Sequence, residues 1–97
     1  MEEELRTIQS WVSHGTLRQF RTEISGRVAE DGYQVKLEGD TLTVYKIRKE
    51  GGFLGIGARK IEEPVLVVIG EGAGMRIPQE SADEEFVGLL ASKLKQH

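Results

Sequence analysis

The sequence predicts an α+β domain of two layers, in which helices cover one face of a four-stranded antiparallel meander. Three observations lead to this prediction. Apolar residues recur at helical spacing before Gly32, the spacing then changes to alternation, and helical spacing returns after Pro78. Helices grouped on either side of a run of strands are typical of the α+β class. A length of 97 residues suits a single domain, residues 1–97.

Composition narrows the class of protein. Apolar residues make up 38% and charged residues 30% of the chain, a balance typical of a folded domain. The absence of cysteine excludes a disulfide scaffold, a zinc site built on thiolates and a thiol nucleophile. No apolar run reaches the ~18 residues of a membrane span. The acidic start at residues 2–4 is unlike a signal peptide, so we expect a cytoplasmic protein.

The charge is unevenly distributed along the chain. Residues 46–60 contain five basic residues and one acidic residue, a net charge of +4, while the whole chain carries −3, which leaves −7 on the rest. A basic stretch on an acidic body is typical of a local patch that attracts anions. The overall balance differs from that of most nucleic-acid-binding domains, which are basic.

Two helices are expected before Gly32. The first begins with acidic residues that suit the positive end of a helix dipole, and Gly15 ends it. Thr16 and Gln19 have the spacing of a capping box at the start of the second helix. Gly32 ends this helix because glycine readily adopts a positive φ. The apolar stripes of the two helices consist of Leu5, Ile8, Trp11 and Val12, and of Leu17, Phe20, Ile24 and Val28.

A β-hairpin is predicted next, with residues 39–40 as a two-residue turn and residues 41–48 as the returning strand. In the register that this turn sets, Leu42 faces Leu37 and Val44 faces Val35. Both apolar sets then lie on one side of the sheet. The opposite side carries Lys36, Glu38, Thr41 and Thr43.

Two further strands and a helix complete the predicted domain. The apolar, β-branched run at residues 64–69 predicts a largely covered strand, with Pro64 at its start, where no ladder donor is needed. Residues 75–77 form a short fourth strand before Pro78. Ser81 and Glu84 have capping-box spacing for the last helix. The apolar face of that helix consists of Phe86, Val87, Leu90, Ala91 and Leu94.

The sequence contains few groups suited to catalysis. His14 stands at a helix end and His97 is the last residue, and their spacing does not suit a metal site. The serines lack a candidate base and a glycine elbow. The acidic clusters fall in first helical turns, where carboxylates stabilise the helix. We therefore expect no catalytic residues, no metal site and no cofactor.

The glycine-rich segment is the most unusual feature of the sequence. Four glycines fall between Gly51 and Gly57, and their spacing matches neither a Walker loop nor a dinucleotide-binding fingerprint. Because glycine destabilises regular structure, four together predict a bent hairpin tip. The bulky apolar residues between them either fold back onto the core or project and dock on a partner. These residues are Phe53, Leu54 and Ile56.

The string Gly-Phe-Leu-Gly-Ile-Gly-Ala-Arg-Lys at residues 52–60 resembles the glycine-rich loop in the N-terminal domain of Jag-type RNA-binding proteins. In that family such a loop also connects two strands, and residues 46–69 correspond to this part. The chain departs from the family in having Ile61 where a proline usually follows the basic residues. The family's RNA-binding domains have no counterpart here. The resemblance implies a small accessory or interaction module associated with RNA proteins.

The preferred interpretation is a non-catalytic interaction module, homodimeric, that docks through the hairpin tip at residues 49–60. Phe53, Leu54 and Ile56 would supply the apolar anchor, and nearby basic residues would set the orientation. A membrane surface is the least favoured receiver. If the second and third strands pair, Lys46, Arg48 and Lys49 come close to Glu62 and Glu63. The basic residues expected to contact an anion or a nucleic acid are Lys46, Arg48, Lys49, Arg59 and Lys60.

Two alternative functions stay open at the level of sequence. The first is a nucleic-acid-binding accessory domain that uses the basic hairpin at residues 46–60, with Tyr45 beside Lys36 and Gln34 as a stacking platform. The second is a small-ligand carrier with a pocket between the sheet and the C-terminal helix.

Overall fold

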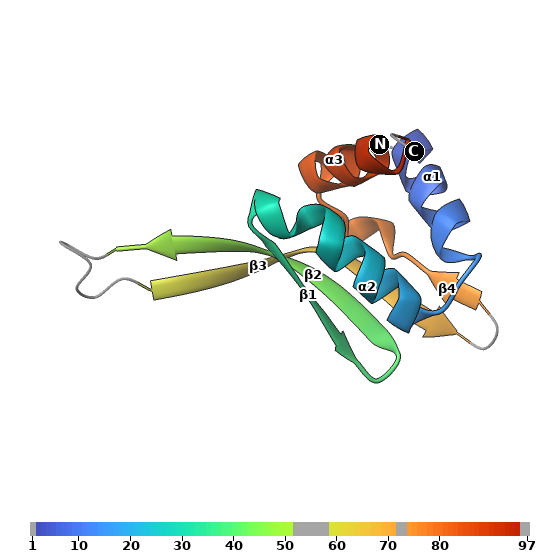
Figure 1. Cartoon of the computed structure of the whole chain (residues 1–97), viewed down its shortest axis with the longest axis horizontal. Coiled ribbons are helices and arrows are strands. Elements are labelled where there is room, and N and C mark those ends of the chain that lie inside the picture. The colour runs from blue at the N-terminus through green and yellow to red at the C-terminus, as the bar shows by residue number, and fades with distance from the viewer. Residues whose placement is uncertain (1, 52–58, 72–73, 96–97) are drawn as a thin grey trace.

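The computed structural model describes residues 2–51, 59–71 and 74–95 and confirms the predicted α+β architecture (Figure 1). The order of elements is α1 (Glu2–Val12), α2 (Leu17–Val28), the 3-10 turn η1 (Ala29–Asp31), β1 (Tyr33–Glu38), β2 (Thr41–Glu50), β3 (Arg59–Glu71), β4 (Gly74–Arg76), the 3-10 turn η2 (Gln79–Ser81) and α3 (Glu84–Leu94).

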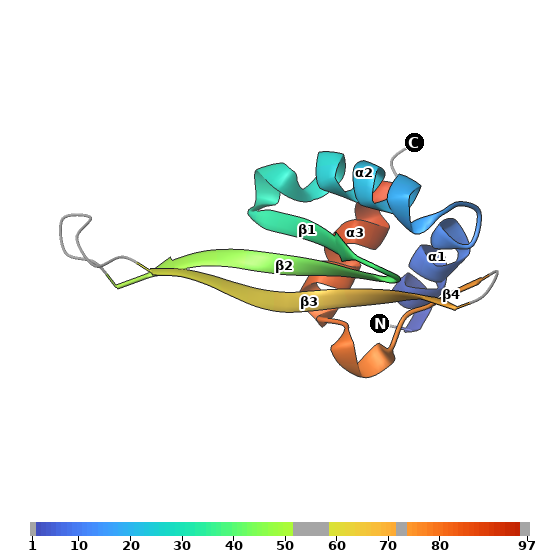
Figure 2. The ribbon, with the colours of Figure 1, turned by 90° about the horizontal axis from the view of Figure 1, so that it is seen from below.

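The four strands form one antiparallel sheet in the order β1-β2-β3-β4, and the helices pack on one of its faces. Helix α2 lies over β1 and β2, α3 contacts β3, and α1 packs against α3 and the short strand β4. In Figure 2 the strands lie in front of α3, which is seen behind the sheet. None of the described helices covers the opposite side of the sheet, which we call the open face.

The core lies between the helices and the sheet. The ring centroids of Tyr33 and Phe86 are 4.7 Å apart, and those of Trp11 and Phe20 are 4.9 Å apart, so aromatic pairs join helices to each other and to the sheet. The side chains with no exposed surface come from all three helices and from β2 and β3: Ile8, Ile24, Val28, Leu42, Val44, Leu66, Val68, Phe86, Val87 and Leu90.

The predicted start of α2 is confirmed, whereas the helix ends at Val28, before the expected Gly32. The Gln19 backbone N–H donates to Thr16 Oγ1 at 3.2 Å, and the Thr16 N–H donates to Gln19 Oε1 at 2.9 Å, which is the reciprocal capping box. Gly32 follows η1 with a φ of 85°, a left-handed conformation that strains other residues. The chain therefore turns from helix into β1 at the one residue type that does so without strain.

The predicted hairpin is confirmed residue by residue. Leu42 lies opposite Leu37, and Val44 lies opposite Val35, in the β1–β2 ladder. Gly39 in the turn has a φ of 58°. Because side chains alternate along a strand, this register places the apolar sets of both strands on the helix side and leaves the polar set on the open face.

The prediction that the third strand starts at Pro64 is wrong. Strand β3 is already paired at Arg59, and Pro64 lies inside it. Val44 lies opposite Leu66 and Tyr45 lies opposite Pro64, so Val65 is an extra residue in β3 at a β-bulge. A bulge interrupts the ladder locally, and a proline is therefore tolerated there.

The predicted capping residue of the last helix is also wrong. Asp83, rather than Ser81, caps α3, because its Oδ2 accepts the Phe86 backbone N–H at 3.0 Å. The Ser81 hydroxyl instead donates to the Pro78 carbonyl at 2.7 Å within η2. Both residue types are good caps, and the extra turn η2 moves the start of the helix two residues along the chain.

Candidate functional site

The second and third strands project beyond the rest of the molecule as a two-stranded ribbon (Figure 1). The first residue of β1, Tyr33, lies opposite Lys46, so β1 does not extend along the remainder of β2. We call residues 46–50 of β2 and 59–63 of β3 the arm. A two-stranded ribbon without a third strand or a helix against it has little stability of its own in water.

The structure brings all five predicted basic residues onto the arm. In the ladder, Lys49 lies opposite Lys60, Lys46 lies opposite Glu63, and Arg59 lies opposite Glu50. Alternation along β2 places Lys46 and Arg48 on the helix side, together with Arg59 of β3, and places Lys49 and Lys60 on the open face. The positive charge is therefore divided between the two faces of the ribbon.

The predicted docking residues Phe53, Leu54 and Ile56 lie outside the described residues. They belong to the segment that connects the distal ends of the two strands of the arm. Their docking role stays a prediction.

Acidic residues of β3 partly neutralise the arm, as expected from the sequence. Arg48 forms an ion pair with Glu63. Lys60 Nζ lies 3.8 Å from Glu62 Oε1, and Lys36 Nζ of β1 donates to Glu62 Oε2 at 2.7 Å. Sequence reasoning placed Lys36 on the open face without pairing it to Glu62, because the two are diagonal neighbours on strands that β2 separates.

The hydrogen bond between Lys36 and Glu62 changes the pKa of both groups. It raises the pKa of the Lys36 ammonium and lowers the pKa of the Glu62 carboxyl, since each charged form is favoured by the other. Both side chains are partly exposed, so water and salt screen their attraction. The pair joins β1 to β3 across β2 at the base of the arm.

Tyr45 lies on the open face, as predicted for a stacking platform. Its ring is half-buried, and the Lys36 ammonium lies 5.1 Å from the ring centroid. This is a cation–π contact, and it occupies part of the surface on which a nucleobase would stack. Gln34 lies opposite Tyr45 in the ladder and accepts a hydrogen bond of 3.4 Å from Lys60.

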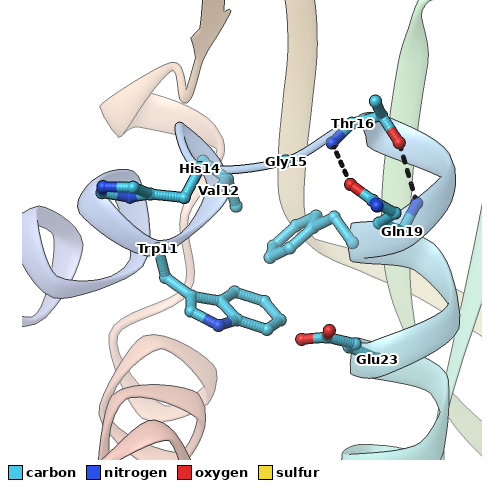
Figure 3. A pocket seen from close by; sticks show the side chains of 8 residues that line it. Trp11, Val12, His14, Gly15, Thr16, Gln19 and Glu23 are labelled. Carbon is cyan, nitrogen blue, oxygen red and sulfur yellow. Dashed lines mark hydrogen bonds between the residues drawn. The ribbon is translucent and has the colours of Figure 1, made fainter.

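A pocket of about 200 Å³ lies between the end of α1 and the start of α2, and sequence reasoning did not identify it (Figure 3). Trp11 forms its apolar wall, and the Glu23 carboxylate extends toward the indole in Figure 3. The His14 ring nitrogen Nδ1 is 2.6 Å from the Ser10 carbonyl oxygen, and Gln19 belongs to the cap of α2. His14 and Gln19 therefore have structural partners, and the residues that line the pocket contain no pairing of a nucleophile with a base.

The space between the sheet and α3 is filled by side chains. Phe86, Val87 and Leu90 have no exposed surface there. The three pockets described border α1, α2, the β1–β2 turn and the segment around Ile77 instead. The ligand-carrier alternative therefore gains no support from these pockets and stays a prediction.

Within residues 2–51, 59–71 and 74–95, the structure contains no group of three or more histidine and carboxylate side chains that could hold a metal ion. None of the described helices is long and apolar enough to cross a membrane.

Comparison of the chain with models of protein families, with curated proteins and with solved structures found no match.

Proposed function

We propose that the protein is a non-catalytic interaction module that docks on a protein partner through the arm and the segment that connects its strands. The observation that carries this proposal is the projection of the arm away from the helices (Figure 1). The molecule measures 48 × 29 × 24 Å along its principal axes. A ribbon that protrudes on one side is exposed to solvent along its length unless another molecule covers it.

The residues at the distal end of the arm support docking. The two strands lead to a segment that contains Phe53, Leu54 and Ile56 between glycines. Burying bulky apolar side chains of this kind against a partner contributes ~1.5–3 kcal/mol for each before the costs of association are subtracted. Lys49, Arg59 and Lys60, all exposed, lie next to this segment and would steer an acidic partner surface.

The arrangement of charge favours a protein partner over nucleic acid. A phosphate backbone is bound by basic side chains gathered on one surface. Here Lys49 and Lys60 lie on one face of the ribbon, whereas Arg48 lies on the other and pairs with Glu63. The contact of Lys36 with the Tyr45 ring reduces the surface that a base could stack on.

A site-specific photo-cross-linker tests the proposal in the cells that make the protein. We expect a cross-linker that replaces Lys49 on the arm to give a protein adduct, and one that replaces the exposed Arg21 of α2 to give none. The double substitution Phe53→Ser and Leu54→Ser in the same chain is expected to remove the adduct from position 49. Adducts with RNA would favour the nucleic-acid alternative, and equal adducts from both positions would contradict docking by the arm.

A further inference from the structure

The outer edge of β3 has no strand partner along the arm among the described residues. Strand β4 pairs only with residues 69–71 of β3, and the Asp83 N–H donates to the Val65 carbonyl at 2.7 Å. We propose that residues 59–63 of β3 pair, antiparallel, with the same residues of a second copy of the chain, about a two-fold axis at Ile61. This inference rests on the proposed function, because it names the partner that the arm binds.

The direction of the backbone groups along β3 follows from the ladder. The Ile47 N–H donates to the Gly32 carbonyl at 2.9 Å, on the β1 side of β2. Because the N–H and C=O of a residue in an antiparallel sheet point to the same side and alternate along the strand, Arg48 directs its groups toward β3. Its partner Ile61 then directs its groups toward β2, and Lys60 and Glu62 direct theirs to the outer edge.

These outward groups match their own copies under a two-fold rotation. With Ile61 opposite Ile61 of the second copy at the axis, Lys60 lies opposite Glu62 of that copy, and Glu62 lies opposite its Lys60. Both members of each such pair present their N–H and C=O to the other strand, which gives two hydrogen-bonded pairs, one on either side of the axis. The interface is isologous, because the same five residues contribute from both copies.

The side-chain charges select the same arrangement. Two basic residues, Arg59 and Lys60, precede Ile61, and two acidic residues, Glu62 and Glu63, follow it. Antiparallel pairing about Ile61 therefore places an opposite charge across from every charged side chain of the segment. Cross-strand pairs of opposite charge stabilise a sheet, whereas like charges opposite each other destabilise it. A second copy of this chain is the partner whose charges this edge complements at each position.

Antiparallel pairing about Ile61 sets the relative position of the two copies. In each copy β3 runs from the distal end of the arm into the body (Figure 2). Antiparallel strands therefore place the two bodies at opposite ends of the paired segment. Pro64 limits the segment at one end, because it has no N–H to donate across the edge. Pairing over so few residues predicts a weak dimer that forms at micromolar concentration and dissociates as salt is added.

Two single charge reversals and their mixture test the proposal by sedimentation equilibrium. Lys60→Glu places glutamate opposite Glu62 of an identical copy, and Glu62→Lys places lysine opposite Lys60, so we expect each variant alone to dimerise at least tenfold more weakly than the wild type. Mixed in equal amounts, the two variants oppose glutamate to lysine at both pairs, and we expect the wild-type affinity to return.

The control variants separate association from folding. Within one chain, Lys60→Glu removes the repulsion from Lys49 opposite it but also removes the contacts of Lys60 with Glu62 and Gln34, so we expect the gain and the loss in monomer stability to offset each other. Arg21→Glu on α2 makes the same charge change away from the edge and should leave the dimer unchanged. Circular dichroism of each variant checks that it is folded.

The outcomes distinguish this inference from the proposed function. Failure of the mixture to restore the dimer, or a wild type that is monomeric throughout the micromolar range, would overturn pairing by the β3 edge. A dimer that resists both charge reversals but is lost on Phe53→Ser with Leu54→Ser would also overturn edge pairing while supporting docking by the arm. If edge pairing is overturned and a cross-linker at position 49 also gives no protein adduct, the proposed docking function is overturned too.

Discussion

Asp83 is expected to set the stability of α3 through a single side-chain hydrogen bond. Its Oδ2 accepts the Phe86 N–H at 3.0 Å, at the start of a helix that contributes five buried residues to the core. Replacing an aspartate cap by alanine costs ~0.5–2 kcal/mol, typically about 1 kcal/mol. In a domain of this size, 1 kcal/mol at the midpoint corresponds to a fall in Tm of about 4–8 °C. We expect Asp83→Ala to lower the Tm within this range.

Two control variants isolate the contribution of the cap. Asp83→Asn preserves a side-chain acceptor and should retain most of the stability, because asparagine caps helices as well as aspartate does. Ser81→Ala removes the hydroxyl that donates to the Pro78 carbonyl and leaves the end of α3 unchanged. Thermal unfolding followed by circular dichroism gives the Tm, and hydrogen exchange at the Phe86 amide reports the cap directly.

The reasoning would be refuted by either of two results. One is an Asp83→Ala variant with the wild-type Tm and a protected Phe86 amide. The other is a Ser81→Ala variant that exposes this amide while Asp83→Ala does not, since that result would restore Ser81 as the cap.

Three further predictions concern backbone conformation and pH. Gly26→Ala should raise the free energy of unfolding by ~0.5–1 kcal/mol, because alanine favours the helix α2 and nothing lies within 4 Å of the added Cβ. Gly32→Ala should lower it by ~1–2 kcal/mol, because a φ of 85° strains alanine. Urea denaturation measures both changes. Burial raises the pKa of the Tyr33 hydroxyl above 10.0. The stability that the neutral hydroxyl gives the folded protein is therefore complete below pH 10 and is lost as the pH rises through the raised pKa. In urea denaturation at increasing alkaline pH, Tyr33→Phe should lose less stability than the wild type. The hydrogen bond from Lys36 lowers the pKa of the Glu62 carboxyl below 4.5. The stability that this pair gives the folded protein is therefore present above pH 4.5 and is lost as the pH falls through the lowered pKa. Glu62→Gln should lose less stability than the wild type on acidification, and an equal loss in both proteins would contradict the pairing.

The parts of the fold that sequence predicts are those whose determinants are neighbours along the chain. The turn at residues 39–40 sets the register of β1 and β2 locally, so Leu37 and Val35 could be matched with Leu42 and Val44 without knowledge of the rest. The box of Thr16 and Gln19 is likewise contained in four residues. Such features depend little on tertiary contacts.

The features that sequence did not predict depend on partners far along the chain. The bulge at Val65 follows from the pairing of β2 with β3: Val44 and Tyr45 are adjacent in β2, but their partners Leu66 and Pro64 have Val65 between them. The presence of Pro64 in the sequence does not indicate this bulge. At the candidate site, the sequence identified the basic residues and their acidic neighbours. Alternation along β2 is enough to assign Lys46, Arg48 and Lys49 to the two faces of the arm, whereas Arg59 and Lys60 require the register between β2 and β3. The pairing of Lys36 with Glu62 spans three strands and has no local signal.

The residues at the free edge of β3 hinder pairing with unrelated strands and also favour pairing with a second copy of the chain. Exposed edges pair with other strands unless charge, proline or a bulge interrupts them, and β3 has all three close together. Charges also penalise wrong registers. Parallel pairing of two copies would oppose like charges at every charged position. A shift of the antiparallel register by two residues would oppose Lys60 to Lys60, or Glu62 to Glu62, at the axis. The antiparallel register centred on Ile61 avoids all of these repulsions. The charged residues that disfavour pairing with other strands are therefore the same residues that favour pairing with a second copy.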